Sequence, residues 1–347
     1  MIKKFFAFTL ALLFVLNGTA VFADTKKPKG KKSAGQTRLV SLLPASDGVV
    51  LIDVQRLLND ALPQILSSNP AKLNEINEQI DHLKTQIGFD VRQFEHIAVG
   101  IAFKQTANAK NLVDPVILLR GKYNSEALLT LAKIAGKGKY REEKAGNKAF
   151  YIFAAKEILA EHKAKITGNM PDKFLDTLMQ KLPSELAVAT VDGGTLAIGS
   201  VARVREMFES KAKIDPSLTA LVNRKSSSIL SFAASTPTGL KQFINLDDDM
   251  LGQSMSAIRL LHGSVDVAGG NVVSSVTAKL INAQQAKSLE ETLGGLQGLI
   301  KGLLASARGD DKKVYARIIE NAKITRLGTD VTVDAQVANA DIALLIK

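Results

Sequence analysis

Residues 49–54 read Val-Val-Leu-Ile-Asp-Val, and this short apolar stretch begins a pattern of elements that occurs twice in the chain. A run of this length, rich in β-branched side chains, is typical of a buried strand. The stretch 228–234, Ser-Ile-Leu-Ser-Phe-Ala-Ala, has the same character and begins the pattern again. The two stretches therefore predict the first strands of two similar halves.

The segments that follow residues 49–54 alternate between helical and extended periodicity. Residues 56–89 show helical periodicity, with a break expected near Pro70 because proline lacks the N–H that a helix interior needs. The remaining elements of the first pass are strands at 97–103 and 116–122, a helix at 125–134, and a hairpin of 140–143 with 149–153.

The second pass has the same order of elements. After the strand at 228–234 we expect a helix between Thr238 and Leu260, strands at 263–268 and 272–280, a helix at 283–305, strands at 324–327 and 331–337, and a helix from Ala340. A joining segment carries helices at 155–164 and 171–181, a hairpin of 186–191 with 195–199, and a helix at 201–210. We expect this hairpin to extend the first sheet.

These patterns predict an α+β protein with mostly antiparallel sheets. Its two similar βαββαβ-like halves, of the ferredoxin-like order, would span residues 39–224 and 225–347, and the first half would include the added helices and central hairpin of the joining segment. A duplication would explain the two passes. The alternative is independent recurrence, because βαββαβ is a common order of elements.

The first 23 residues have the pattern of a cleaved secretory signal. Lys3 and Lys4 precede an apolar run from Phe5 to Leu16, and Val21 and Ala23 suit positions −3 and −1 of a signal peptidase site. A helix needs about 20 apolar residues to span a bilayer, and this run is shorter. The sequence therefore favours a cleaved signal over a retained membrane anchor. We therefore expect an exported protein, periplasmic or extracellular, without a transmembrane span after cleavage.

The absence of cysteine constrains an exported protein further. With 0 cysteines, the chain has no disulfide, no thiolate metal site and no lipidation site.

Residues 24–38 predict a disordered basic tether. The segment is rich in Lys, Gly, Ser and Pro and has no apolar periodicity, so it cannot bury enough surface to offset the entropy of ordering. Five lysines are candidates for contact with an anionic envelope surface: Lys26, Lys27, Lys29, Lys31 and Lys32. The alternative is a solvated spacer.

Charge and composition argue against a nucleic-acid partner. The formal net charge is +11, but much of the excess lies in the signal and the tether. Tryptophan is absent and several phenylalanines lie in the signal, so base-stacking side chains are scarce. The same shortage weakens a carbohydrate-binding hypothesis.

Several motifs resemble catalytic or metal sites and fail on inspection. The four histidines, His82, His96, His162 and His262, lie on different expected elements without the i, i+4 spacing of a zinc pair, so we interpret them as surface or helix-end residues. Asn245, Asp247 and Asp249 resemble the start of a calcium loop, but Met250 replaces its glycine and Ser256 its glutamate.

Three further motifs have simpler explanations. Residues 136–139, Gly-Lys-Gly-Lys, are too short for a phosphate loop and predict a helix C-cap with a turn. Ser210 and Lys213 have the spacing of a serine–lysine pair, but they lie in what looks like an exposed helix end. Residues 308–310, Arg-Gly-Asp, match an adhesion tripeptide by a short pattern that chance supplies often. We therefore assign no catalytic residue, metal ligand or cofactor.

Two helical stripes are candidates for packing or recognition. The first, Leu73, Ile76, Ile80, Leu83 and Ile87, is an amphipathic seam that we expect to pack on the protein's own sheet rather than on a partner helix. The second consists of Gly294, Gly298 and Gly302. Glycines cost roughly 1 kcal/mol each in a helix interior, so this stripe predicts a close-packing face or a ligand opening.

Two stretches resemble uncharacterised exported bacterial proteins built from α+β units. One is residues 43–54, Leu-Pro-Ala-Ser-Asp-Gly-Val-Val-Leu-Ile-Asp-Val, followed by Arg56-Leu57-Leu58; the other is 192–200, Asp-Gly-Gly-Thr-Leu-Ala-Ile-Gly-Ser. The resemblance implies export and an α+β fold and supplies no catalytic residue.

Three functions remain open from the sequence. The first is a non-catalytic exported protein that binds an unknown envelope protein or the anionic envelope surface, or has a structural role there, because no catalytic constellation withstands inspection. The second is a carrier of an apolar or amphipathic ligand, with the glycine stripe as its entrance. The third is a hydrolase whose residues converge only in three dimensions.

Overall fold

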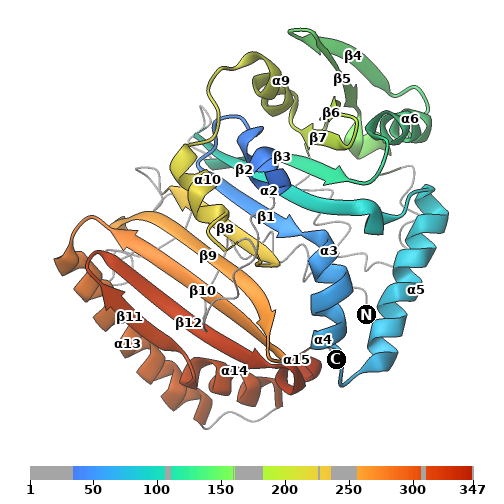
Figure 1. The fold of residues 1–347 in the computed structure, drawn as a ribbon. Coiled ribbons are helices and arrows are strands. Elements are labelled where there is room, and N and C mark those ends of the chain that lie inside the picture. The colour runs from blue at the N-terminus through green and yellow to red at the C-terminus, as the bar shows by residue number, and fades with distance from the viewer. Residues whose placement is uncertain are drawn as a thin grey trace.

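A computed structural model describes residues 34–105, 111–158, 160, 183–225, 227–235, 256–305 and 310–345. Twelve strands form one sheet in the order β11-β12-β10-β9-β8-β1-β2-β3-β7-β6-β5-β4 (Figure 1). The strands are β1 Gly48–Asp53, β2 Phe94–Gln105, β3 Asn111–Gly121, β4 Tyr140–Ala145, β5 Lys148–Phe153, β6 Leu186–Asp192, β7 Thr195–Gly199, β8 Leu230–Ser235, β9 Ile258–Ala268, β10 Asn271–Leu280, β11 Lys323–Leu327 and β12 Asp330–Ala338. The α+β class with an antiparallel sheet is therefore confirmed.

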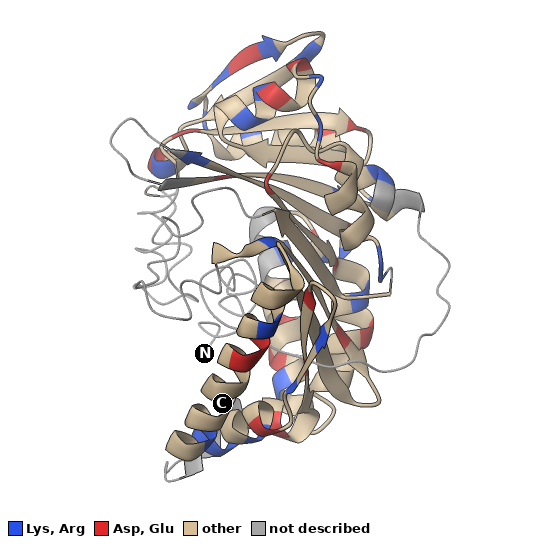
Figure 2. Ribbon diagram, turned by 90° about the vertical axis from the view of Figure 1, so that its left-hand side faces the viewer, with Lys and Arg blue, Asp and Glu red and all other residues tan. Residues whose placement is uncertain are grey.

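The helices lie on both faces of this sheet. They are α2 Ala34–Ser41, α3 Val54–Arg56, the π-helical turn η2 Leu57–Ala61, α4 Leu62–Ile65, α5 Pro70–Ile87, the 3₁₀ turn η3 Val91–Gln93, α6 Ser125–Ala135, α9 Val201–Glu209, α10 Pro216–Val222, α13 Ala283–Ala305, α14 Asp310–Glu320 and α15 Asn339–Leu345. Their charged residues are of both signs, whereas the strands in the middle of the sheet carry few (Figure 2).

The two strands expected to begin the halves pair with each other at the centre of the sheet. Val50 of β1 lies opposite Phe232 of β8, and Leu51 lies opposite Ser231, in an antiparallel register. From this central pair, β1, β2 and β3 follow in one direction and β8, β9 and β10 in the other. The halves of the prediction therefore share one sheet, and the sheet continues across residue 225.

The ferredoxin-like order of each half is not confirmed. A ferredoxin-like half has parallel neighbours joined by crossover helices, whereas every strand pair among the described residues is antiparallel. The hairpin β6–β7 does extend the first sheet. It does so between β3 and β5, so hairpin β4–β5 lies at the sheet edge.

The faces of the sheet can be named by two side chains of β1. Face A is the side of Val50, and face B is the side of Leu51; cross-strand partners share a face. Face B of the first seven strands packs against α2, α9 and α10 in the largest apolar cluster, which includes Leu39, Val204 and Leu218. Face A of β9–β12 packs against α13, α14 and α15, and also against α4 and α5.

The helix α5 begins at the break predicted near Pro70 and ends at Ile87, two residues before the predicted end. Asn69 caps it by accepting a hydrogen bond from the Lys72 N–H, Pro70 occupies the first turn, and Gly88 ends it in the left-handed conformation. Ile76 is buried in a cluster with Leu73 and Ile80, so this part of the amphipathic seam packs within the protein as expected. The side chains of Leu83 and Ile87 lie outside the described part.

The helix α2 corrects the boundary of the predicted tether. The sequence places the start of folding at Leu39, but α2 begins at Ala34, so residues 34–38 are helical. Leu39, Val40 and Leu43 are fully buried. Their burial stabilises α2 as an amphipathic helix. The polar residues that precede them in the chain gave no sign of this helix.

Candidate functional site

Polar side chains form two adjacent rows on face B of the strands β9, β10, β12 and β11, with Val273 on one side of the rows and Leu260 and Leu327 on the other. We call this surface the hydroxyl face. One row across the strands consists of cross-strand neighbours Ser231, Ser264, Ser275 and Asp334. The next row consists of His262, Thr277, Thr332 and Thr325. The period of two in a strand places every second residue here, and Val272, Val276 and Ala278 of β10 point to face A instead. The five strands from β8 to β11 therefore carry two rows of polar side chains, most of them hydroxyls, of which Ser231, Ser264 and Asp334 are buried.

Hydrogen bonds between neighbouring strands order part of the hydroxyl face. The Ser275 hydroxyl donates to Asp334 Oδ1 at 2.8 Å, and the Thr277 and Thr332 hydroxyls lie 2.9 Å apart. Asp334 is only 5% exposed. A carboxylate this buried needs a hydrogen-bond donor, and Ser275 supplies one.

Two titratable groups lie near the margin where α10 meets this face. Burial lowers the pKa of His262, and the cations Arg224 and Lys225 lower it further against the opposite effect of Asp330. His262 is therefore neutral at neutral pH. Burial raises the pKa of Asp266, whose carboxylate pairs with the guanidinium of Arg56 at 2.7 Å.

The geometry of the hydroxyl face suits binding better than catalysis. A serine or threonine nucleophile needs a base within hydrogen-bond reach, and among the hydrogen bonds described on this face none joins His262 to a hydroxyl. Hydroxyls both donate and accept hydrogen bonds, so a flat array of them can match a polar surface. The described helices that pack on β10, β11 and β12 include α4, α5, α13, α14 and α15, and they lie on face A.

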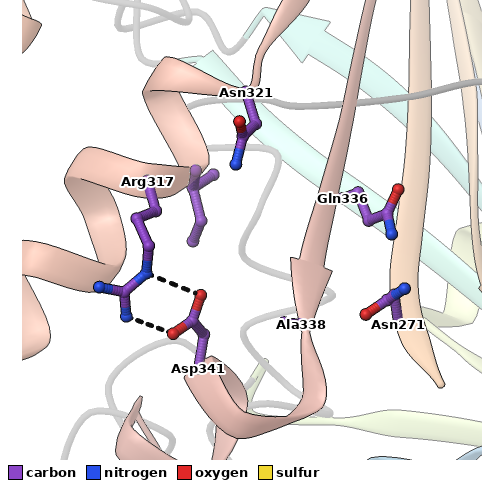
Figure 3. Close-up of a pocket in the computed structure, with 7 residues that line it drawn as sticks. Asn271, Arg317, Asn321, Gln336, Ala338 and Asp341 are labelled. Carbon is purple, nitrogen blue, oxygen red and sulfur yellow. Dashed lines mark hydrogen bonds and ion pairs between the residues drawn. The ribbon is translucent and has the colours of Figure 1, made fainter.

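A polar pocket of about 370 Å³ lies at the end of the same strands (Figure 3). Its lining is Asn271, Arg317, Ile318, Asn321, Gln336, Ala338 and Asp341. The Arg317 guanidinium makes a bidentate contact with the Asp341 carboxylate, including Nε to Oδ2 at 3.1 Å. Asn271 and Gln336 lie on the other side of β12 (Figure 3). The polar groups do not converge on one point, and the polar lining does not suit an apolar ligand.

The structure places the predicted glycine stripe on the outer side of α13. A Cβ added to Gly294, Gly298 or Gly302 would meet no heavy atom within 4 Å. The neighbouring Leu299 and Leu303 are 60% and 65% exposed. The prediction of a close-packing or ligand face stays a prediction.

Several predicted sites lie outside the described residues. They are the signal peptide, the tether lysines Lys26, Lys27, Lys29, Lys31 and Lys32, the calcium-like residues 245–249, His162, and residues 308–309 of the adhesion tripeptide. Most of the helices expected at 155–164 and 171–181, and of the helix expected between Thr238 and Leu260, also lie there.

The motifs that are described behave as follows. Gly136 is the C-cap of α6 and a turn follows it, as predicted. Ser210 is the C-cap of α9, and Lys213 donates to the Met207 carbonyl at 2.8 Å rather than to a serine. His96 and His262 differ from the prediction, because they lie half-buried inside β2 and β9.

Two properties of the described residues bear on ligands and membranes. No group of three His, Asp or Glu side chains is arranged to hold a metal ion in this part of the chain. No helix in the described ranges is long and apolar enough to cross a bilayer.

Sequence reasoning missed the hydroxyl face although one signal for it was present. Residues 271–280 read Asn-Val-Val-Ser-Ser-Val-Thr-Ala-Lys-Leu, in which hydroxyl residues interrupt an apolar strand. What the sequence did not provide was the register, because the pairing of Ser275 with Ser264 and Asp334 depends on contacts between distant segments.

Comparisons with known proteins do not identify a function. No protein-family model matches the chain, and no curated protein matches it. Among solved structures, crystal form III of TP0453 is similar with 11% identity and a TM-score of 0.41, covering 88% of this chain and 96% of that one. Crystal form IV of TP0453 is similar with 10% identity and a TM-score of 0.42, covering 90% and 99%. The absence of a matching family model agrees with the resemblance described above, which points to no characterised family. Structural similarities this weak support no inference about function.

Proposed function

We propose that this chain is an exported, non-catalytic protein of the cell envelope that binds a polar partner through the hydroxyl face. One observation carries the proposal. The strands β9 to β12 have helices packed on face A, whereas no described helix packs on face B of β10, β12 and β11, where Ser275, Thr277 and Thr332 are partly exposed and Asp334 is buried. A solvated sheet face would also be polar, so binding must be measured directly.

The binding test uses purified protein and isolated envelope fractions of the host. We expect the wild-type protein to sediment with envelopes. The double variant Ser275→Arg, Thr277→Arg places two large cations on the hydroxyl face and should lose this sedimentation. The matched control is Gln284→Arg on the exposed side of α13, which should sediment like the wild type. Equal sedimentation of the double variant and the control would contradict the proposal, provided that both have wild-type urea midpoints.

Export is tested separately by fractionation and mass. The predicted cleavage follows Ala23, so the protein recovered from the host should begin at Asp24 and leave the cytoplasmic fraction. An uncleaved chain that stays in the cytoplasm would refute export. It would leave the binding experiment unaffected.

A further inference from the structure

Three side chains from three elements meet beneath α2. Gln36 comes from α2 and is 4% exposed, Asp53 ends β1, and His96 lies opposite Asp53 on β2. The Gln36 amide nitrogen lies 2.9 Å from His96 Nε2 and 3.3 Å from Asp53 Oδ2. The distance from His96 Nε2 to Asp53 Oδ2 is 3.7 Å. We call these three residues the α2 latch.

The hydrogen bond between Gln36 and His96 determines which nitrogen of the His96 ring carries the proton. An amide nitrogen can only donate, so His96 Nε2 must accept from Gln36, and the neutral ring carries its proton on Nδ1. Reversing the Gln36 amide would bring its oxygen against the Asp53 carboxylate, so the orientation shown is favoured. Asp53 is itself held in place because its Oδ1 accepts the Arg56 N–H at 2.9 Å and caps α3.

The surroundings of His96 favour this neutral state. Burial lowers its pKa, and the charge of Arg120 on β3 lowers it too, while Asp53 and the neighbouring Glu95 act in the opposite direction. Arg120 lies opposite His96 in the sheet and contacts Asp192 at 3.4 Å. His96 Nδ1 is buried without a described partner and carries its proton in both states, so protonation changes only the contacts of Nε2.

We propose that the α2 latch is acid-sensitive: a proton on His96 Nε2 turns this atom from an acceptor for Gln36 into a donor to Asp53, and α2 undocks from the sheet. Two donors would then face each other across the 2.9 Å contact. Asp53 Oδ2 would accept a hydrogen bond from the imidazolium instead of from the Gln36 amide. An eight-residue helix is unstable alone, so α2 depends on such contacts.

The absence of native cysteine makes undocking measurable. Leu39 of α2 is fully buried, so a thiol in the Leu39→Cys variant reacts with a disulfide reagent only when α2 opens. At each pH, the reaction rate of the folded variant is divided by the rate of the same variant unfolded in urea. This ratio corrects for the change of thiol reactivity with pH. We expect the normalised rate to rise roughly fivefold or more between about pH 7.5 and about pH 5. Val204→Cys on α9, equally buried, is the control and should show no such rise.

Two variants of the latch test its chemistry in the Leu39→Cys background. His96→Gln keeps an acceptor near the Nε2 position and cannot be protonated, so the acid response should disappear. Gln36→Glu should invert the response, because the introduced carboxylate repels Asp53 at neutral pH and pairs with the imidazolium at acidic pH. Amide hydrogen exchange of residues 36–43 in the wild-type protein, corrected for intrinsic rates, gives the same readout without a core substitution. A flat profile, an equal rise at Val204→Cys, or a response that persists in His96→Gln would overturn the proposal.

Discussion

Arg203 shows how one charged side chain can be buried when a carbonyl, a carboxylate and a hydroxyl accept its hydrogen bonds. It is 1% exposed, and its Nη1 donates to the Ala45 carbonyl at 2.9 Å and to Glu206 at 2.6 Å. Its Nη2 donates to the Ser46 hydroxyl at 2.7 Å. The guanidinium therefore ties α9 to the loop that leads into β1.

We expect Arg203→Ala to destabilise the protein by about 2–4 kcal/mol, because it removes three hydrogen bonds and leaves a cavity in a buried site. Arg205→Ala is the matched control on the same helix. Arg205 is 44% exposed and pairs with Glu143 at the surface, so its loss should cost less than about 1 kcal/mol. Urea unfolding measures both values, and equal costs would refute the role assigned to Arg203.

His262 should make stability depend on pH. Its pKa is lower in the folded protein than in the unfolded chain, so the unfolded chain binds the proton more readily. The stability that His262 contributes is complete above the unfolded value of about 6.5 and is lost as the pH falls through the lower folded value.

The measurement compares urea midpoints at about pH 7.5 and about pH 5. His262→Gln should reduce the loss of stability at acidic pH. An unchanged pH dependence in His262→Gln would show that other groups cause it.

At the scale of elements, two glycines predict opposite effects of the same substitution. At Gly121, at the end of β3, an added Cβ would lie 2.1 Å from the Gln93 carbonyl oxygen, whereas at Gly298 of α13 it would meet no heavy atom within 4 Å. We expect Gly121→Ala to cost at least about 2 kcal/mol because backbone must move. Gly298→Ala should stabilise by about 0.5–1 kcal/mol through helix propensity. Thermal unfolding distinguishes the two, and a destabilised Gly298→Ala would show that this side of α13 is already packed.

The basic segment before α2 predicts a weak electrostatic attachment. Deleting residues 24–33 leaves α2 whole and removes the tether lysines Lys26, Lys27, Lys29, Lys31 and Lys32. We expect co-sedimentation with anionic vesicles at low salt to fall, by at most about 1 kcal/mol for each lysine. Neutral vesicles are the control. Unchanged sedimentation with anionic vesicles would favour a simple spacer.

Local sequence patterns predicted many helices and strands correctly, but they did not predict how the strands are ordered in the sheet. The strand at 49–54, the break in the helical stretch near Pro70 and the hairpin of β6 and β7 were all predicted, because turn residues and period are local properties. The position of β7 beside β3 was not, because strand order depends on pairing between distant segments. The hydroxyl face and the α2 latch depend on the same long-range register, which explains why sequence reasoning missed both.

At the scale of the whole molecule, the shared sheet predicts cooperative unfolding. Five residue pairs join β1 to β8, and the largest apolar cluster includes Val49 of β1 and Ala233 of β8. We expect calorimetry to show one transition with equal calorimetric and van't Hoff enthalpies. Two transitions, or independent folding of a fragment ending at Arg224, would mean that the predicted boundary at residue 225 separates autonomous domains.

The pairing of β1 with β8 also bears on the order in which the chain can assemble. Among the described strands β1 is the first to be synthesised and lies in the middle of the sheet, but one of its two neighbours comes from the region after Arg224. Until β8 is available, the growing chain has an unpaired apolar edge, which is an aggregation hazard. Long-range pairing of this kind also slows folding. The first strand of the sheet therefore has both of its edges paired only after the chain has been synthesised past β8.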